Sequence, residues 1–359
     1  PRVELHVHLD GAFDEALLYK AACAAPDRLP EFGFDAMKQE HFPVKAPVAR
    51  CCCERDFRQL VTCKNKRSLR EMLKCFEHFL PVVRGQLELL EQLALRFVEK
   101  QAAQNIIYTE VRYSPHLLAD GGAMGSTEKA DPIPVLEAVT RGLRAGSEKY
   151  GVTVNQILCC ITWRPEWAAE TVELAAAHRE SWPCAVVAID IAAGEAHFDA
   201  AAFPELHKPH RVAFARAKEL GVRVTMHAAE DSPADNVRAA LEDYGAERIG
   251  HAYRLVGEGG NRDIVASLVR KGVHVEACPT SSFETGGWAG PAAEAVDWAS
   301  HPIAELVRAG VSLGLNTDDP MVFETDLEKE FQLARRMGFS EKQLLQLTLS
   351  AADAAFISA

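Results

Sequence analysis

The stretch Val3–Gly11 reads Val-Glu-Leu-His-Val-His-Leu-Asp-Gly, and it alternates apolar with polar residues before it ends in a turn. A period of two residues is typical of a β-strand. Seven further segments of this kind follow it along the chain: Ile106–Tyr113, Val152–Thr162, Cys184–Ala192, Arg223–Ala229, Arg248–Tyr253, Val273–Cys278 and Val311–Thr317. Helical patterns such as Val212–Leu220 and Asn261–Lys271 separate most of them. Strands that alternate with helices indicate a parallel sheet, and eight such units close a barrel, so we predict an α/β fold of the TIM-type (β/α)8 class.

The interval between the first strand and Ile106 is much longer than the others. It contains Leu69–Leu80, where apolar residues recur at helical spacing. We interpret this region, about residues 12–100, as a helical insertion after the first strand. Because α/β barrels of about 200 to more than 400 residues form one domain, we expect residues 1–359 to be a single barrel domain that includes the insertion.

The composition excludes several classes of protein. With 48% hydrophobic and 25% charged residues, the 359-residue chain can build a large core. Its 39 lysine and arginine residues against 51 acidic residues give a net charge of −12, which repels phosphate backbones, so we expect no nucleic-acid partner. No apolar run reaches the roughly 18 residues of a membrane span.

The start of the chain and its cysteines bear on its compartment. We expect no signal peptide, because the chain opens with Pro1 and the charged Arg2, although without an initiator methionine an upstream signal stays open. None of the ten cysteines forms a C-x-x-C pair, and neighbours such as Cys159 and Cys160 make a poor disulfide framework. We interpret them as reduced thiols of a cytoplasmic protein.

Ionisable residues collect where the predicted strands end, which is the end of such a barrel that carries the active site. His6 and His8 are two residues apart, so both side chains point into the barrel, and two imidazoles suit a zinc ion. The pair is equally typical of two hydrogen-bonded strand histidines. The other strand-end residues are His227, Glu230, His251, Asp318 and Asp319. An Asp pair can also cap a helix or begin a turn, and a lone histidine is more often structural.

The whole set favours metal chemistry more strongly than its parts do. His6, His8, His227 and Asp318 can converge on one ion and leave an open position for water, as a catalytic zinc site requires. His251 and Glu230 then remain as a candidate base and a candidate acid.

Three motifs resemble the adenosine deaminase family of amidohydrolase-type metal-dependent hydrolases. They are Val3–Gly11, Glu110–Ala119 (Glu-Val-Arg-Tyr-Ser-Pro-His-Leu-Leu-Ala) and Ser312–Pro320 (Ser-Leu-Gly-Leu-Asn-Thr-Asp-Asp-Pro), and the similarity extends from Val3 to about Phe356. The resemblance implies zinc-dependent hydrolytic deamination of adenosine, and of 2′-deoxyadenosine, to inosine and ammonia. It also implies one zinc ion per chain and a small purine nucleoside as the ligand.

The resemblance also implies a role for each matching residue. The implied zinc ligands are His6, His8, His227 and Asp318, and Asp318 would also orient the zinc-activated water that attacks purine C6. Glu230 resembles the acid that protonates N1, and His251 the group that takes or steers the proton of the water. The implied substrate contacts are His8, Asp10 at the ribose 5′-hydroxyl, Asp319 at N7, the backbone of Ala193 at N3, and the apolar lid residues Leu69, Met72, Leu73 and Phe76. Ordinary packing against the barrel is the alternative reading of the lid residues.

Three positions depart from the family, which usually has glycine where this chain has Ala193, Ala229 and Ala252. Glycine at such sites permits close approach or unusual backbone angles. A methyl group there either crowds the purine and shifts Glu230 or fits without consequence, and the sequence leaves both readings open.

Three other functions remain as alternatives. A deaminase of AMP or of an N6-modified adenylate would share the zinc chemistry but would need basic groups near Asp10, where a carboxylate favours a neutral hydroxyl. A two-metal hydrolase commonly carries a bridging lysine at the end of the fourth strand, where this chain has Asp190 and no lysine, so we expect one metal. The third alternative is a catalytically silent barrel that binds adenosine, which the three alanines would favour.

Overall fold

A computed structural model describes residues 1–28, 32–35, 40–43, 53–123, 126, 128–179, 183–195, 203–257, 259–288 and 296–357. Eight parallel strands form one sheet in the order β1-β4-β5-β6-β7-β8-β9-β10. Their bounds are β1 Arg2–His8, β4 Ile106–Tyr113, β5 Thr153–Ile161, β6 Val186–Ala192, β7 Arg223–Ala228, β8 Arg248–His251, β9 His274–Ala277 and β10 Ser312–Leu315. All eight predicted strands are therefore confirmed.

The first and last strands close the barrel through a parallel bridge between Val7 and Asp318. The backbone N–H of His8 donates to the carbonyl of Asp318 at 2.7 Å, and the N–H of Asp318 donates to the carbonyl of His6 at 3.1 Å. This closure confirms the (β/α)8 barrel. It also places the ends of the first and last strands side by side, although more than 300 residues separate them in the sequence.

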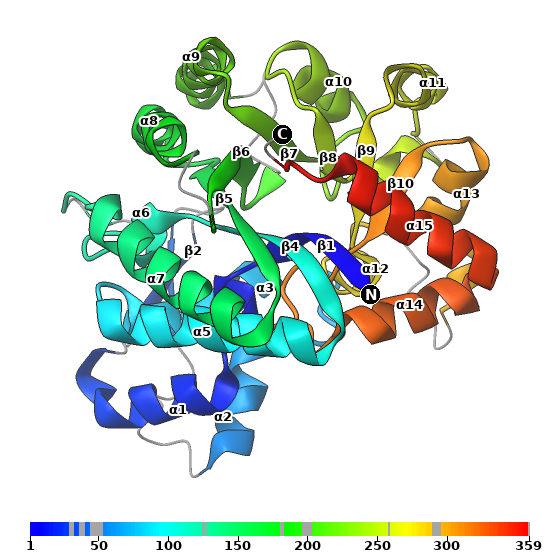
Figure 1. Ribbon diagram of the computed structural model, residues 1–359. Coiled ribbons are helices and arrows are strands. Elements are labelled where there is room, and N and C mark those ends of the chain that lie inside the picture. The colour runs from blue at the N-terminus through cyan, green and yellow to red at the C-terminus, as the bar shows by residue number, and fades with distance from the viewer. Residues whose placement is uncertain are drawn as a thin grey trace.

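Helices surround the strands (Figure 1). From residue 87 onward they are α5 Leu87–Ala103, α6 Pro115–Leu118, α7 Pro132–Tyr150, α8 Ala168–His178, α9 Pro204–Leu220, α10 Asp235–Glu242, α11 Arg262–Lys271, α12 Pro279–Glu284, α13 Pro302–Arg308, α14 Leu327–Arg336 and α15 Glu341–Ala354. Helix α7 illustrates the local signals: the Asp131 side chain accepts from the N–H of Ile133, and Gly151 ends the helix with φ of 73°. The apolar faces pack on the barrel, as with the buried Leu90, Leu93 and Phe97 of α5.

The segment between β1 and β4 is helical but also contains a small sheet. Before α5, its described α-helices and strands are α1 Glu15–Ala24, β2 Phe32–Asp35, β3 Glu40–Pro43, α2 Glu54–Val61, α3 Leu69–Phe76 and α4 Leu80–Val83, with β2 antiparallel to β3. The helical spacing of apolar residues over Leu69–Leu80 is divided between two helices, because α3 ends at Phe76 and α4 begins at Leu80. A proline inside a helix lacks an N–H and clashes with the preceding turn, so Pro81 is compatible only with the start of a new helix.

Within the described residues, no helix is both long and apolar enough to cross a membrane. The cysteines of this part of the chain carry free thiols.

Candidate active site

The carboxyl ends of the strands bring the predicted metal-binding side chains together. Ligand atoms of His6, His227, His251 and Asp318 all lie within 4.8 Å of one another, and all four residues are buried. Nε2 of His6 lies 3.3 Å from Oδ1 of Asp318. Nε2 of His8 lies 3.4 Å from the same oxygen and 3.2 Å from Nε2 of His227. Three of the four ligands expected from the sequence, His6, His227 and Asp318, thus converge with His251, while the fourth, His8, contacts Asp318 and His227 of this group.

The donor set meets the requirements of a metal ion. Nε2 of His6 is buried and makes no hydrogen bond to any described residue, nor does Nε2 of His251. Buried polar atoms normally have partners, so such atoms facing a common point indicate that a ligand completes the site. Imidazole nitrogens and a carboxylate oxygen are the ligands of catalytic zinc sites. The residues present therefore fit the zinc ion that the sequence predicts.

Two of these residues have unusual backbone angles. His251, at the end of β8, has φ of 71°, and Asp318, just after β10, has φ of 62°. Residues other than glycine rarely adopt this left-handed region, and such strain, of order 1–3 kcal/mol each, persists only when the surrounding structure enforces it. Here the barrel closure and the strand pairing hold both side chains toward the centre.

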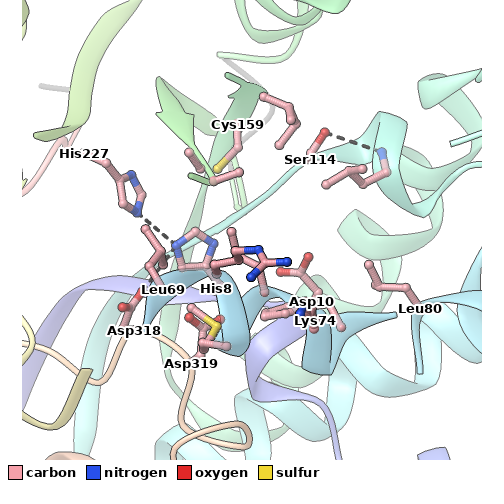
Figure 2. Close-up of a pocket in the computed structure, with 18 of the residues that line it drawn as sticks. His8, Asp10, Leu69, Lys74, Leu80, Ser114, Cys159, His227, Asp318 and Asp319 are labelled. Atoms are coloured by element: carbon pink, nitrogen blue, oxygen red, sulfur yellow. Dashed lines mark hydrogen bonds and ion pairs between the residues drawn. The ribbon is translucent and has the colours of Figure 1, made fainter. Parts of the chain in front are cut away.

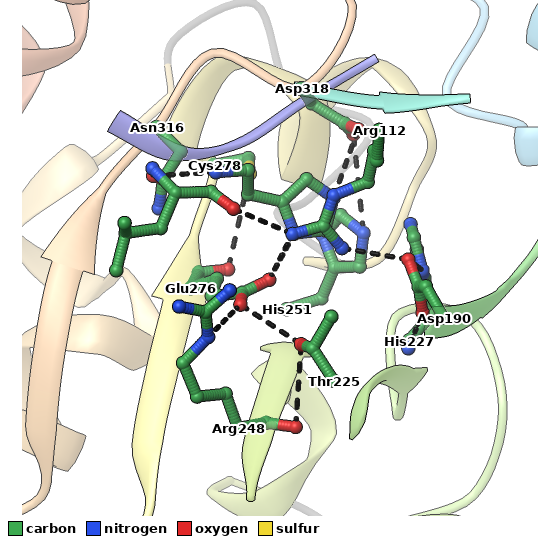
Figure 3. Close-up of polar contacts among 12 residues, drawn as sticks. Arg112, Asp190, Thr225, His227, Arg248, His251, Glu276, Cys278, Asn316 and Asp318 are labelled. Atoms are coloured by element: carbon green, nitrogen blue, oxygen red, sulfur yellow. Dashed lines mark hydrogen bonds and ion pairs between the residues drawn. The ribbon is translucent and has the colours of Figure 1, made fainter. Parts of the chain in front are cut away.

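A buried network of charges orients two of the histidines from the barrel interior (Figure 3). Oε2 of Glu276, on β9, lies 2.8 Å from Nδ1 of His6, and Oδ2 of Asp190, on β6, lies 2.9 Å from Nδ1 of His227. Arg112, on β4, joins the two carboxylates, with distances of 2.6 Å to Glu276 and 2.7 Å to Asp190. A carboxylate on Nδ1 fixes the ring orientation and leaves Nε2 as a ligand atom.

We expect Glu276→Gln to lower zinc affinity about 10- to 100-fold, because it removes the charge that orients His6. Competition with a chromogenic chelator measures this affinity on folded protein. Glu110→Gln is the matched control: Glu110 is also fully buried, and Oε2 of Glu110 also contacts Arg248, at 2.6 Å, but neither oxygen contacts a site histidine. Equal zinc affinities for the two variants would contradict this role of Glu276.

Three of the histidines, His8, His227 and His251, line a cavity, and Figure 2 shows the first two of them. All the predicted substrate-contact residues line it: His8, Asp10, Leu69, Met72, Leu73, Phe76, Ala193 and Asp319. The four apolar residues come from one face of α3, so this helix of the insertion covers the cavity that the barrel ends form. Further lining residues, which were not predicted, include Arg70, Lys74, Ser114, Cys159 and Trp163.

Glu230 and His251 face the cavity with pKa values displaced in opposite directions. Burial, with the nearby charges of Asp318 and Glu195, raises the pKa of Glu230 well above its usual 4.5. Burial lowers the pKa of His251 well below 6.5. Both displacements favour the uncharged forms, a protonated carboxyl group beside a neutral imidazole. Nε2 of His251 lies 3.6 Å from Oε2 of Glu230 and 4.0 Å from Oδ2 of Asp318, between the acid and the metal-binding group.

Two further carboxyl groups lie beneath α3. Burial raises the pKa of Asp10 to about 6, and Oδ1 of Asp10 has no hydrogen-bond partner among the described residues. Asp319 packs so closely on Gly11 that a Cβ atom there would lie 1.8 Å from Oδ1 of Asp319. The glycine of the opening motif is thus required by this close approach.

The three alanines that replace family glycines all have left-handed backbones. Ala193, Ala229 and Ala252 have φ of 82°, 58° and 59°. Glycine adopts this region freely, whereas alanine does so at a cost of roughly 1–2 kcal/mol. The backbone angles therefore explain the usual glycine, and the chain keeps them despite the methyl groups.

The comparisons with known proteins agree with this geometry. The sequence profile described as "Adenosine deaminase" matches residues 53–359. The chain belongs to the adenosine deaminase family. The adenosine deaminase of Bos taurus is 34% identical over 374 residues, an alignment that covers 99% of this chain and 90% of the relative. The chain is accordingly a hydrolytic deaminase.

Solved structures place the adenosine deaminase fold in a wider context. The structure of an Arabidopsis N6-mAMP deaminase is 26% identical, covers 100% of this chain and 94% of its own, and superposes with a TM-score of 0.75. An amidohydrolase from Burkholderia ambifaria, solved with bound Zn, superposes with a TM-score of 0.78 at 22% identity, covering 100% of this chain and 86% of its own. The second likeness concerns the fold alone.

Sequence reasoning missed the residues that support the deaminase site from behind. Arg112, Asp190 and Glu276 are fully buried in the barrel, and Glu195 is 4% exposed. One signal was available: a charged residue inside a strand of a parallel barrel, such as Glu276 in Val273–Cys278, must find a buried partner. The partners themselves depend on register and could not be assigned without the structure.

Proposed function

We propose that this deaminase converts adenosine, and 2′-deoxyadenosine, to inosine and ammonia by zinc-dependent hydrolysis. The observation that carries the proposal is the juxtaposition of the histidine–aspartate group with Glu230 at one wall of the cavity. The neutral imidazole of His251 lies 3.6 Å from the protonated carboxyl group of Glu230 and 4.0 Å from Asp318 of the metal-binding group, an arrangement that suits the displacement of an amine from a purine ring.

In this proposal His6, His8, His227 and Asp318 hold one zinc ion. When bound, the ion supplies Lewis-acid activation of water near neutral pH. Three imidazoles and one carboxylate leave a position open for that water. We assign His8 rather than His251 as the third imidazole, because Nε2 of His8 is 3.4 Å from Asp318 whereas Nε2 of His251 is 4.0 Å away.

The remaining side chains would manage the protons and the substrate. Water oxygen adds to C6 as Glu230 delivers its proton to N1. One proton of the water passes by way of His251 to the C6 amine, the C6–N bond breaks to release ammonia, and the remaining hydroxyl proton returns to Glu230, which leaves the C6 carbonyl of inosine. His251 takes or steers the proton of the attacking water, since its imidazole is neutral, and Asp318 orients that water. In this pose Asp319 contacts N7, the backbone N–H of Ala193 contacts N3, and Asp10 accepts from the ribose 5′-hydroxyl.

We further propose that residues 1–359 form one barrel domain in which about residues 12–100 serve as the lid. The placement of Leu69, Met72, Leu73 and Phe76 in the cavity wall supports a lid that packs on the purine and ribose. A small purine nucleoside is the proposed ligand, and the net charge of −12 makes nucleic acid an unfavourable one. A cytoplasmic location stays a prediction.

One observation favours a nucleotide substrate instead. Lys74 and Arg70 line the same cavity as Asp10, and Figure 2 labels Lys74 and Asp10 among its lining residues. Both cations are already engaged by Glu71, however: its Oε1 lies 2.8 Å from Nζ of Lys74 and 3.6 Å from Nη1 of Arg70. Asp10 is buried and its Oδ1 lacks a partner, so its charge acts more strongly on the ligand, and we favour the nucleoside.

We expect kcat/KM for adenosine to exceed that for AMP by about 100-fold or more, because a like charge facing a carboxylate costs several kcal/mol. Asp10→Asn should bring the kcat/KM values for adenosine and AMP closer together, since the amide no longer repels phosphate. Initial rates with adenosine, 2′-deoxyadenosine and AMP measure it. Lys74→Ala is the complementary variant, which should leave adenosine turnover within a few-fold. If AMP were turned over faster than adenosine, and if Lys74→Ala abolished that advantage, the substrate would be a nucleotide instead.

A further inference from the structure

We propose that Glu195 is a positioning residue that fixes the turn carrying Glu230 against the turn carrying Ala193. The inference rests on the proposed function, in which these two turns hold N1 and N3 of the purine. Glu195 follows the end of β6 by three residues, whereas Glu230 follows the end of β7. Neither sequence spacing nor a predicted role connects the two residues.

A single carboxylate oxygen of Glu195 holds the whole turn after β7. Its Oε2 accepts from the backbone N–H groups of Glu230 at 2.9 Å, Asp231 at 3.3 Å and Ser232 at 3.1 Å. Three successive N–H groups that point to one spot form an anion-binding concavity, and hydrogen bonds to a charged acceptor are about twice as strong as neutral ones. Glu195 is 4% exposed, so water does not compete well for these donors.

The turn needs an external support because its own backbone is strained. Ala229, directly before Glu230, has φ of 58°. Its N–H donates to Oγ of Ser232 at 3.2 Å, and Nε of Arg254 donates to the carbonyl of Glu230 at 3.3 Å. These contacts close the turn on itself and on the segment after β8, but only Glu195 joins it to the turn after β6 among the hydrogen bonds of the described residues.

The hydrogen bonds of Glu195 to residues 230–232, here called the clamp, connect Glu230 with the turn of Ala193, and these are the two groups that would face one edge of the purine. Ala193 lies two residues before Glu195, and Oγ1 of Thr162 donates to the carbonyl of Gly194 between them at 3.3 Å. N1 and N3 flank the same carbon of the ring, so their partners must keep a fixed spacing. A displacement of Glu230 by about 1 Å can cost about 100-fold in rate, although Glu195 touches neither substrate nor metal.

Three variants separate position from charge. Glu195→Gln keeps an acceptor oxygen and loses the charge, Glu195→Asp keeps the charge but withdraws the oxygen by one methylene, and Glu195→Ala removes both. We expect kcat for adenosine to stay within about threefold in Glu195→Gln, and to fall roughly 10-fold in Glu195→Asp and roughly 100-fold in Glu195→Ala. KM should change much less than kcat, because the lid and the ribose contacts are intact.

The matched control is Glu330→Ala. Glu330 is also a buried carboxylate that accepts from a backbone N–H, that of Thr280 at 2.9 Å, but it does not line the cavity. Its kcat should equal that of the wild type once the folded fraction is taken into account, and zinc content should be unchanged in every variant. An equal loss of kcat in the control would overturn the proposal, as would equal losses in Glu195→Gln and Glu195→Ala.

Amide hydrogen exchange tests the clamp without turnover. In the zinc-loaded protein, the peptide that contains residues 230–232 should exchange at least 10-fold faster in Glu195→Ala than in the wild type or Glu195→Gln. Unchanged exchange in Glu195→Ala would overturn the clamp. If the wild type did not deaminate adenosine but Glu195→Ala still exchanged faster, the clamp would be supported and the proposed substrate rejected. Failure of the clamp and failure of the proposed function are therefore distinguishable.

Discussion

Glu230→Gln is expected to lower kcat for adenosine by about 10²- to 10⁴-fold while zinc remains bound, because an amide of nearly the same shape cannot give a proton to N1. The carboxyl group is well placed for this role, since Oε1 of Glu230 is buried without a partner among the described residues. Substrate affinity should change little. Absorbance assays of adenosine turnover and elemental analysis of the same sample make the measurement.

The pH dependence gives the same prediction a second readout. Burial and neighbouring carboxylates raise the pKa of Glu230, so its proton is kept above the usual range of a carboxyl group and is lost as the pH rises through the raised pKa. Wild-type kcat should therefore fall on the alkaline side, and the residual rate of Glu230→Gln should lack that fall. Glu330→Gln is the control, since the buried Glu330, with a pKa of about 7, does not line the cavity. Full activity in Glu230→Gln would remove Glu230 from the mechanism.

His227→Ala is expected to reduce bound zinc from about one ion per chain to less than about a tenth, and deamination to background. The reason is geometric: Nε2 of His227 is 3.2 Å from that of His8, and Asp190 fixes the ring from the other side. Elemental analysis after gel filtration measures the zinc.

The control for this loss is His301→Ala. His301 is 1% exposed and Nε2 of His301 contacts Oγ of Ser282 at 2.7 Å, but it does not line the cavity. We expect this variant to keep its zinc. A folded His227→Ala protein that retains stoichiometric zinc would show that the ion binds elsewhere.

The sequence was sufficient for the features that depend on periodicity. Alternation in Val3–Gly11 placed His6 and His8 on one side of a strand, and eight strand–helix units required a barrel whose strand ends meet. The apolar face of α3 that lines the cavity was predicted from the spacing of three and four residues between Leu69, Met72, Leu73 and Phe76. These are local patterns, and the closure of the barrel converts them into a site.

The sequence was insufficient for features that depend on register and turn geometry. The partnership of Arg112 with Asp190 and Glu276 joins three strands, and no spacing in the chain encodes it. Glu195 binds N–H groups 35 to 37 residues away, and backbone donors carry no sequence signature. The break between α3 and α4 is marked by Pro81, which the spacing of apolar residues alone does not take into account.

The most direct test of the account is the loss of adenosine absorbance catalysed by the purified chain before and after removal of its metal. We predict conversion to inosine with about one zinc per chain, loss of that activity after treatment with a chelator, and its return on addition of one equivalent of zinc. A folded, zinc-loaded protein that leaves adenosine unchanged, or one that deaminates it equally fast when stripped of metal, would contradict the account.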